Sequence, residues 1–593
     1  MKDFLKFTLA TITGIILIGA VFFFISAASM FSIVSSGSTE VTVPKNSIFT
    51  LNLSGTLVER NEANIQTILN TISGQEMSTY GLDDILNSIK KAKEQKDIQG
   101  IYLKAGYFGA SPASLQAIRR ALADFKESGK FIIAYADNYT QGVYYLASVA
   151  DKVMLNPKGA VEWKGLSSNL IFYKDLLDKL GVEMQIFKVG TYKSAVEPYI
   201  TNEMSTANRE QVTAFCHSIW NQIVNEVAES RHITPQRLNE MADEMMAFQP
   251  AEKSVEYGLA DTLIYQNDMR DYLKRYAGLD EDDNQTSLTL ADMCNVNRNV
   301  PKDKSGNIVA VYYAFGGIVD IANNLSGEPS IVGNKVIKDL RKLKEDEDVK
   351  AVVLRVNSPG GSAFASEQIW KAVKDLKAEK PVIVSMGDYA ASGGYYISSI
   401  ADTIVAEPTT LTGSIGIFGM IPNGKQLTDR LGIHSNVVKT NKFSDFGNLM
   451  RPFSNDEKAI MQHMINEGYE TFVGRCAEGR HTTKDAIKAV AEGRVWTGEM
   501  ALELGLVDVL GGLDTALDIA VKKAGVERYT LVSYPAKQSV FEILTNLEDT
   551  GNYIESQMLK NKLGSFYEQL RFIQDIGNAP AIQARMPYDL NIR

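Results

Sequence analysis

The residues best suited to covalent chemistry lie in two glycine-rich turns in the second half of this 593-residue chain. The first reads NSPGGS at 357–362, and the second reads AASGGY at 390–395, with Ser392 between small residues. Glycines leave backbone N–H groups open to an incoming oxygen, so Gly361 and Gly393 are candidate donors to an oxyanion. Ser392 is then a candidate nucleophile, although a serine before a helix is often an N-cap.

An internal repeat distinguishes between these two roles for the serine. The segment DNYTQGVYYLASVADKVMLNP at 137–157 aligns with DYAASGGYYISSIADTIVAEP at 388–408, an offset of 388 − 137 = 251 residues. Ser392 then corresponds to Gln141 in the first copy, since 392 − 251 = 141. The first copy has kept the scaffold but has no nucleophile at this position, which favours a catalytic role for the serine in the second copy.

A nucleophilic serine needs a base to accept its proton. No histidine lies near either turn in the sequence, and lysine replaces histidine in Ser–Lys enzymes. Lys193, within KVGTYKSAVEPY, corresponds to Ser444 in the second copy, since 193 + 251 = 444. Each copy therefore holds one half of a shared site. The ordinary alternative is a surface lysine, and His434 and Lys442 remain open as other bases.

The elements around the two turns alternate between short apolar runs and amphipathic stretches. Such alternation of strand and helix predicts a parallel sheet with right-handed crossovers. Each repeat is therefore expected to be an α/β domain. In the second copy the predicted strands are 349–357, 381–387 and 403–408, and the predicted helices are 366–380 and 392–402.

The repeat also sets the domain boundaries. A polar, initially acidic stretch separates the two copies, as a linker would, and helix-like apolar spacing predicts a helical C-terminal tail. The expected units are an N-terminal stub and anchor (1–40), a first α/β repeat (41–275), a linker (276–306), a second α/β repeat (307–535) and the tail (536–593).

The N-terminal segment 7–34 is apolar and carries no charge. It exceeds the roughly 20 residues that a helix needs to cross a bilayer. Lys2 and Lys6 precede it and Glu40 follows it, so the positive-inside rule places the N-terminus in the cytoplasm and the body on the extracytoplasmic side. A cleaved signal peptide is the alternative. Both interpretations predict an exported body.

The composition of the chain argues against several classes of partner and cofactor. The formal net charge is −10, which argues against a nucleic-acid partner. Three cysteines are too few and too scattered for a disulfide framework, and five histidines form no ligand cluster. We therefore expect neither a metal nor another cofactor.

Four motifs carry a resemblance to a known family. NSPGGS, GDYAASGGYYISSIAD, LTGSIGIFG at 411–419 and GTYKSAVEPY resemble the long, tandem form of signal peptide peptidase A (protease IV). The similarity extends over nearly the whole chain, including the N-terminal apolar segment. The wider fold resembles the Clp protease subunit and the crotonases.

The resemblance implies a role for each motif. It implies that Ser392 attacks the scissile carbonyl, that Lys193 is the general base, and that Gly361 and Gly393 form the oxyanion hole. It implies that Ser414 holds the lysine amine by a hydrogen bond. It further implies a homotetramer on the lipid bilayer that degrades released signal peptides.

Two other functions are compatible with the same sequence. A crotonase-like acyl-CoA enzyme would share the fold and the oxyanion hole, but an exported body has no evident supply of coenzyme A. A non-catalytic membrane scaffold would have two decayed repeats, against which the intact turns argue. The sequence leaves open whether the serine and the lysine meet within one chain or across two chains.

Overall fold

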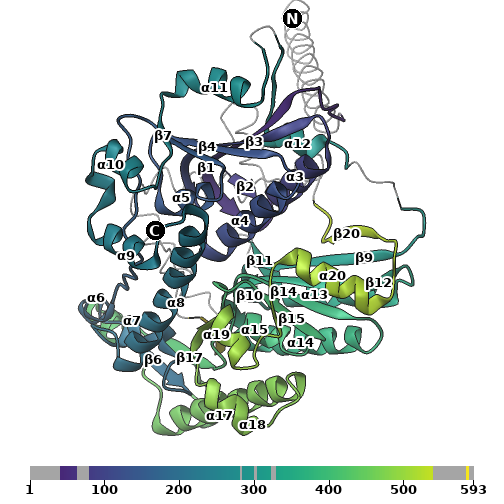
Figure 1. Cartoon of the computed structure of the whole chain (residues 1–593). Coiled ribbons are helices and arrows are strands. Elements are labelled where there is room, and N and C mark those ends of the chain that lie inside the picture. The colour runs from purple at the N-terminus through teal and green to yellow at the C-terminus, as the bar shows by residue number, and fades with distance from the viewer. Residues whose placement is uncertain are drawn as a thin grey trace, which may run out of the picture.

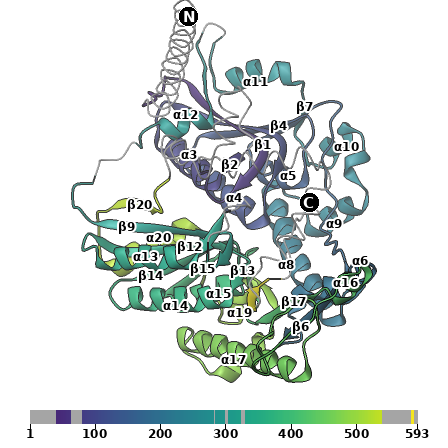
Figure 2. The ribbon, with the colours of Figure 1, turned by 180° about the vertical axis from the view of Figure 1, so that it is seen from behind.

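The computed structural model describes residues 40–62, 79–280, 283–298, 303–321, 329–537 and 582–586. Two α/β bodies follow one another along this part of the chain, and Figures 1 and 2 show them one above the other. The predicted anchor at 7–34 lies outside the described residues. Within the described ranges, no helix is both long and apolar enough to cross a membrane.

The first body is built on a parallel sheet with the order β2-β1-β3-β4-β5-β7, and β8 pairs with β1. Its strands are β1 (Ser47–Val58), β2 (Thr79–Gly81), β3 (Ile98–Gly109), β4 (Phe131–Ala136), β5 (Lys152–Leu155), β7 (Thr262–Leu263) and β8 (Thr286–Leu288). Its helices are α3 (Leu82–Glu94), α4 (Pro112–Lys126), α5 (Gln141–Ala147), α6 (Lys174–Leu180), α7 (Glu197–Ile200), α8 (Thr206–Arg231), α9 (Pro235–Asp243), α10 (Ala251–Glu256), α11 (Met269–Tyr276) and α12 (Leu290–Asn295).

The second body repeats this plan with the order β18-β16-β14-β12-β9-β20, while β15 lies between β14 and β19. Its strands are β9 (Ile308–Phe315), β12 (Val349–Ser358), β14 (Val382–Ala391), β15 (Thr403–Ala406), β16 (Leu411–Gly413), β18 (Val495–Thr497), β19 (Val509–Leu510) and β20 (Thr530–Tyr534). Its helices are α13 (Gly333–Glu345), α14 (Ala363–Lys377), α15 (Gly393–Ser398), α16 (Lys425–Arg430), α17 (Asn455–Gly479), α18 (Lys484–Val490), α19 (Gly498–Glu503) and α20 (Leu513–Ala524). The prediction of tandem α/β repeats with parallel sheets is confirmed.

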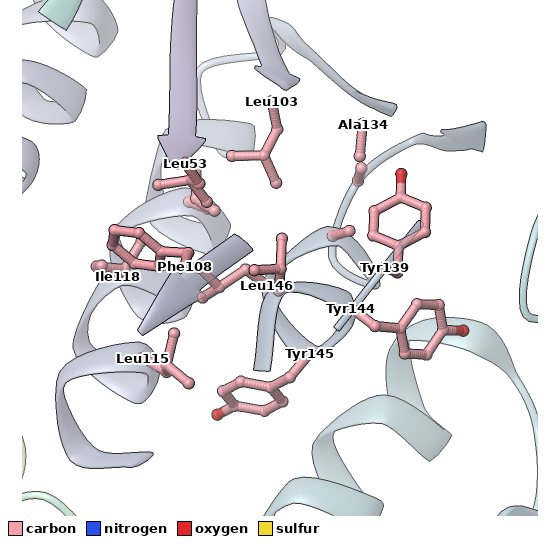
Figure 3. Close-up of a cluster of buried hydrophobic side chains, with 14 of the residues drawn as sticks. Leu53, Leu103, Phe108, Leu115, Ile118, Ala134, Tyr139, Tyr144, Tyr145 and Leu146 are labelled. Atoms are coloured by element: carbon pink, nitrogen blue, oxygen red, sulfur yellow. The ribbon is translucent and has the colours of Figure 1, made fainter. Parts of the chain in front are cut away.

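The central strands are apolar nearly throughout because both faces of each sheet are covered. In the second body, Val352 and Leu354 of β12 pack toward α13 and α14, whereas Val353 packs with Ala516 and Ala520 of α20. Figure 3 shows the matching core of the first body, where side chains from strands and helices meet. The residues labelled there are Leu53, Leu103, Phe108, Leu115, Ile118, Ala134, Tyr139, Tyr144, Tyr145 and Leu146.

The expected linker contains structure that belongs to the first body. Within residues 276–306, β8 pairs with β1, and α12 begins at a capping box formed by Thr289 and Asp292. Leu290 and Met293 of α12 are buried in the first core. The polar composition of this stretch predicted a linker without secondary structure. Leu290 and Met293 are nevertheless enough to pack a short helix against the first core.

A third sheet joins the two bodies, with the order β11-β10-β13-β21-β17-β6. Its strands are β6 (Glu183–Lys188), β10 (Gly317–Val319), β11 (Ser330–Val332), β13 (Gly360–Ser362), β17 (Phe418–Asn423) and β21 (Ile582–Arg585). β6 comes from the first repeat and pairs along its whole length with β17 of the second; both figures show the two strands side by side.

The described end of the chain differs from the predicted helical tail. Ile582–Arg585 is a strand that pairs on both sides, with β13 and with β17. Two neighbouring strand edges determine the conformation of this segment, because pairing with them satisfies its backbone groups. The stretches whose spacing suggested helices, 540–547 and 565–573, lie outside the described residues.

Candidate active site

Ser392 occupies the sharp turn where β14 ends and α15 begins. Its φ is 54°, a left-handed conformation that is uncommon for a residue with a side chain and that is concentrated at functional sites. Its backbone N–H donates to the carbonyl of Gly413 at 2.8 Å. The serine is fully buried, and its side chain makes no capping bond to α15. The N-cap alternative therefore does not describe this side chain.

Lys193 reaches the serine from the first repeat, although 199 positions separate them in the sequence. It lies between β6 and a short 3₁₀ helix, Ser194–Val196. Its Nζ is 2.8 Å from Ser392 Oγ. The same Nζ donates to two oxygens of Ser414, the side-chain Oγ and the backbone carbonyl, at 3.1 Å each. The structure thus brings together, within one chain, the three side chains that the sequence singled out.

The surroundings of Lys193 disfavour its charged form. Burial lowers the pKa of the ammonium well below its ordinary value of 10.5, because desolvation penalises the charge. The ring centre of Phe418 lies 6.0 Å from Nζ and offsets part of this penalty, because an aromatic face attracts a cation. The stem of the lysine passes so close to Gly493 that a Cβ there would lie 2.7 Å from the Cβ of Lys193. A neutral amine beside Ser392 is positioned to accept a proton.

Backbone contacts across the two repeats hold the loop that carries the lysine. The N–H of Tyr192 donates to the carbonyl of Glu492 at 3.0 Å. Gln211 of α8 donates through Nε2 to the Tyr192 carbonyl at 3.1 Å and accepts from the N–H of Val495 at 3.1 Å. The contacts with Glu492 and Val495 tie the first repeat to the start of β18 and the residues just before it, so the lysine is fixed relative to the second repeat.

The first glycine turn lies directly against the second. Gly360 has a φ of 100°, and a Cβ on it would lie 2.8 Å from the backbone nitrogen of Gly393 and 2.1 Å from the carbonyl oxygen of Ala584. Only glycine leaves room for this approach. Gly361 follows in β13, where it pairs with Ile318 on one side. The two predicted oxyanion donors therefore lie on adjoining turns beside Ser392.

A buried polar network connects both turns to the first repeat. Arg355 of β12 donates through Nε to Glu59 at 2.6 Å, and Asn357 donates to Glu59 at 2.9 Å and to Asp388 at 3.1 Å. Asp388 in turn accepts from the N–H and hydroxyl of Ser114 in α4. Burial, with the charge of Glu59, raises the pKa of the Asp388 carboxyl. Asn357 lies four residues before Gly361, and Asp388 lies four residues before Ser392. This network therefore sets the position of both turns.

Sequence reasoning missed this network and the position of β21. A lone arginine within the apolar run VKAVVLRVN was the available signal, since a buried charge needs a partner. Nothing in the sequence indicated Glu59 as that partner. The pairing of β21 depends on two strand edges from distant parts of the chain, which local patterns do not show.

The other candidate residues lie elsewhere. Gln141 accepts hydrogen bonds from the N–H groups of Lys164 and Gly165, so it closes a loop where the second copy holds its serine. His434 is exposed near Asp429, and Lys442 forms an ion pair with Asp456. Across the described residues, no cluster of histidine, cysteine and carboxylate side chains is arranged to hold a metal ion.

The chain is similar to known proteins along most of its length. The model of peptidase family S49 matches residues 124–280 and again 374–527, and a Clp protease model matches 323–406. Protease 4 of Salmonella typhi is 36% identical over 527 residues, covering 86% of this chain and 84% of that protein. Protease 4 of Haemophilus influenzae is 36% identical over 569 residues, covering 91% and 90%. The chloroplastic serine protease SPPA of Arabidopsis thaliana is 29% identical over 500 residues, covering 83% and 71%. The chain therefore belongs to peptidase family S49 and is a serine peptidase.

Proposed function

We propose that this peptidase is a membrane-anchored endopeptidase that uses Ser392 as nucleophile and Lys193 as general base, and that it degrades released signal peptides. The observation that carries the dyad is the 2.8 Å contact between Lys193 Nζ and Ser392 Oγ in a fully buried setting. A base must be within hydrogen-bond reach and unprotonated; Lys193 lies within reach of Oγ, and its burial lowers the pKa of the ammonium, which favours the neutral form.

The positions of these atoms support the following reaction. Lys193 accepts the hydroxyl proton as Ser392 Oγ attacks the scissile carbonyl, and the N–H groups of Gly361 and Gly393 stabilise the oxyanion. The lysine then gives the proton to the leaving amine, and an acyl-enzyme remains. Water, deprotonated by the same amine, hydrolyses the ester. Ser414 accepts a hydrogen bond from Nζ and so keeps the lone pair directed at the nucleophile.

The substrate class follows from the surroundings of the dyad and from the sequence. β13 and β17 of the third sheet lie beside the dyad and pair with the strand β21, and strand pairing of this kind is a mode of peptide recognition in which backbone bonds supply affinity. Signal peptides are apolar and remain near the membrane after release. The apolar segment 7–34 would place the catalytic body on the extracytoplasmic side of the cytoplasmic membrane, as a single-pass protein in contact with the lipid bilayer.

Assembly into a homotetramer is part of the same proposal. Equivalent segments of the two repeats, around α6 and α16, lie side by side, since the N–H of Leu427 donates to the Gly181 carbonyl. They expose large apolar side chains that a single chain leaves uncovered, and contiguous exposed apolar surface marks interaction sites. These side chains are Ile171, Leu176, Leu180, Leu431, Ile433 and Val438.

Hydrolysis of a synthetic apolar signal peptide by the detergent-solubilised protein tests the dyad. Ser392→Ala and Lys193→Ala should both lose activity while keeping the native circular dichroism spectrum. Lys442→Ala is the matched control, because that lysine is exposed and paired with Asp456, and it should retain full activity. An active Ser392→Ala variant would overturn the assignment of the nucleophile, and an active Lys193→Ala variant would overturn that of the base.

A further inference from the structure

The side chain of Arg494, just before β18, contacts the loop of the first repeat that carries Lys193. Its guanidinium carbon lies 4.7 Å from the ring centre of Tyr192 and 4.3 Å from that of Trp496, so it contacts an aromatic ring from each repeat. Nη1 donates to the Tyr192 hydroxyl at 3.1 Å and forms an ion pair with Glu210 of α8 at 2.9 Å. Because Tyr192 directly precedes Lys193, this side chain joins the two repeats next to the base.

The backbone of the same arginine holds the other partner of the lysine. The N–H of Ser414 donates to the Arg494 carbonyl at 2.7 Å, and Ser414 has a φ of 50°, which is uncommon for a residue with a side chain. Gly413, the preceding residue, pairs with Val495 and accepts a hydrogen bond from the N–H of Ser392. Arg494 therefore contacts both the loop that carries the amine and the turn whose oxygens orient it.

The first repeat has no such arginine. Its helix α10 corresponds to α19, since the related sequences YGLADTL at 257–263 and LGLVDVL at 504–510 follow them, an offset of 504 − 257 = 247 residues. At this offset Arg494 corresponds to Ala247, and Trp496 corresponds to Gln249. The cation and its second ring are thus present in the copy that holds the nucleophilic serine and replaced in the copy that does not.

An arginine beside an aromatic ring is by itself an ordinary packing contact, found about once per 70–80 residues. Arg237 of α9 is an example, since it lies 4.4 Å from the ring centre of Tyr257 and forms an ion pair with Glu244 at 2.8 Å. Arg494 differs because its two contacts lead to the same amine, one through the chain and one through Ser414. Among the described residues its buried Nε has no hydrogen-bond partner, so the rings, the hydroxyl and the ion pair hold the guanidinium.

We propose that Arg494 is a positioning residue for the general base, which holds the Lys193 loop against the Ser414 turn so that the amine stays aligned with Ser392 and shielded from water. This inference rests on the proposed function, since it takes Lys193 as the base. Without the guanidinium the loop is held less firmly, the amine moves away from the nucleophile, and water reaches it. Hydration favours the ammonium form, which cannot accept a proton.

The pH dependence of kcat separates this role from a general effect on packing. In the wild type kcat should rise with pH as Lys193 loses its proton, and burial places this rise below the ordinary pKa of a lysine. Burial is the cause of that lowered pKa, although several titratable or charged groups surround the loop. These groups are Tyr192, Glu197, Glu210, Glu492 and Arg494.

The experiment compares full-length, detergent-solubilised wild type with Arg494→Ala, using an apolar signal-peptide segment without ionisable side chains as substrate. In the variant the midpoint of the rise in kcat should move to higher pH by about one unit or more, because water solvates the ammonium. At neutral pH kcat should be about 100-fold lower, the loss expected for a misplacement of about 1 Å.

Two further variants make the result decisive. Arg237→Ala removes an arginine with the same kind of ring contact and ion pair on α9, and it should keep both kcat and the midpoint. Arg494→Met keeps an unbranched stem but no charge, so it should shift the midpoint in the same direction even if Arg494→Ala folds poorly. A midpoint at the wild-type pH in a folded Arg494 variant would overturn the inference, since a loss of packing alone lowers kcat equally at every pH. An active Lys193→Ala variant would instead contradict the proposed base.

Discussion

Replacing Lys193 with methionine separates the catalytic contribution of the amine from its effect on stability. Methionine keeps an unbranched apolar stem but has no proton acceptor. A general base contributes roughly 10²–10⁴-fold to a rate, which corresponds to about 3–5 kcal/mol of activation free energy at about 1.4 kcal/mol per tenfold. We therefore expect kcat for signal-peptide hydrolysis to fall by at least about 100-fold.

The same substitution should change how stability depends on pH. Burial lowers the folded-state pKa of Lys193 well below 10.5, while the unfolded chain keeps the ordinary value. Between these two values the unfolded protein binds one proton more than the folded protein, so the free energy of unfolding rises with pH by about 1.4 kcal/mol per unit. The cost that Lys193 imposes is absent above pH 10.5, grows as the pH falls, and becomes constant below the folded-state pKa.

The measurement is urea unfolding of both proteins at pH 8.5 and pH 9.5, followed by tryptophan fluorescence. From pH 8.5 to pH 9.5, the free energy of unfolding of the wild type should rise by about 1.4 kcal/mol relative to that of the variant. Hydrogen bonds to Ser392 and Ser414 are lost in the variant, but that loss is the same at both pH values and cancels. A difference that does not change with pH would mean that Lys193 keeps its proton in the folded protein, and the reasoning about the base would be refuted.

Three further substitutions test other parts of the site. Ser414→Ala removes one hydrogen bond to the lysine amine, worth about 1 kcal/mol, so kcat should fall about fivefold with little change in KM; a loss of several hundredfold would show that Ser414 does more than orient the amine. Glu59→Gln removes the carboxylate that pairs directly with buried Arg355, and breaking a buried ion pair typically costs about 3–5 kcal/mol; thermal unfolding should show a clear decrease in Tm, and an unchanged Tm would contradict the network. Gly360→Ala places a Cβ 2.8 Å from the Gly393 nitrogen and should displace an oxyanion donor, lowering kcat by about 10²–10³-fold; steady-state kinetics on folded protein measures this, and near-normal kcat would exclude that donor.

Much of the fold followed from local patterns. Apolar runs such as VKAVVLRVN are typical of strands buried on both faces, and 349–357 is indeed β12 between α14 and α20. The repeat of 251 residues predicted that the second sheet would copy the first. The third sheet was not predictable in this way, because its strands come from both repeats and from the end of the chain, and strand pairing leaves no trace in a single segment.

The candidate site was predictable to a similar extent. Comparing the two copies singled out Ser392 and Lys193, because each residue is present in one copy and replaced in the other. That comparison gave no information on the distance between the two side chains, on Glu59 as the partner of Arg355, or on the pairing of β21 with β13 and β17. These features depend on contacts between residues hundreds of positions apart, such as the 296 that separate Glu59 from Arg355.

The sequence by itself determined the alternation of strands and helices around the two turns, the duplication, and the residue types able to carry out acyl transfer, because periodicity and side-chain chemistry are properties of single segments. Only the tertiary structure decided that the lysine and the serine lie 2.8 Å apart and that the lysine is buried. The proposed role of Lys193 as a base depends on that burial, since an amine loses its proton near neutral pH only where the folded chain has removed the water that would solvate its charge.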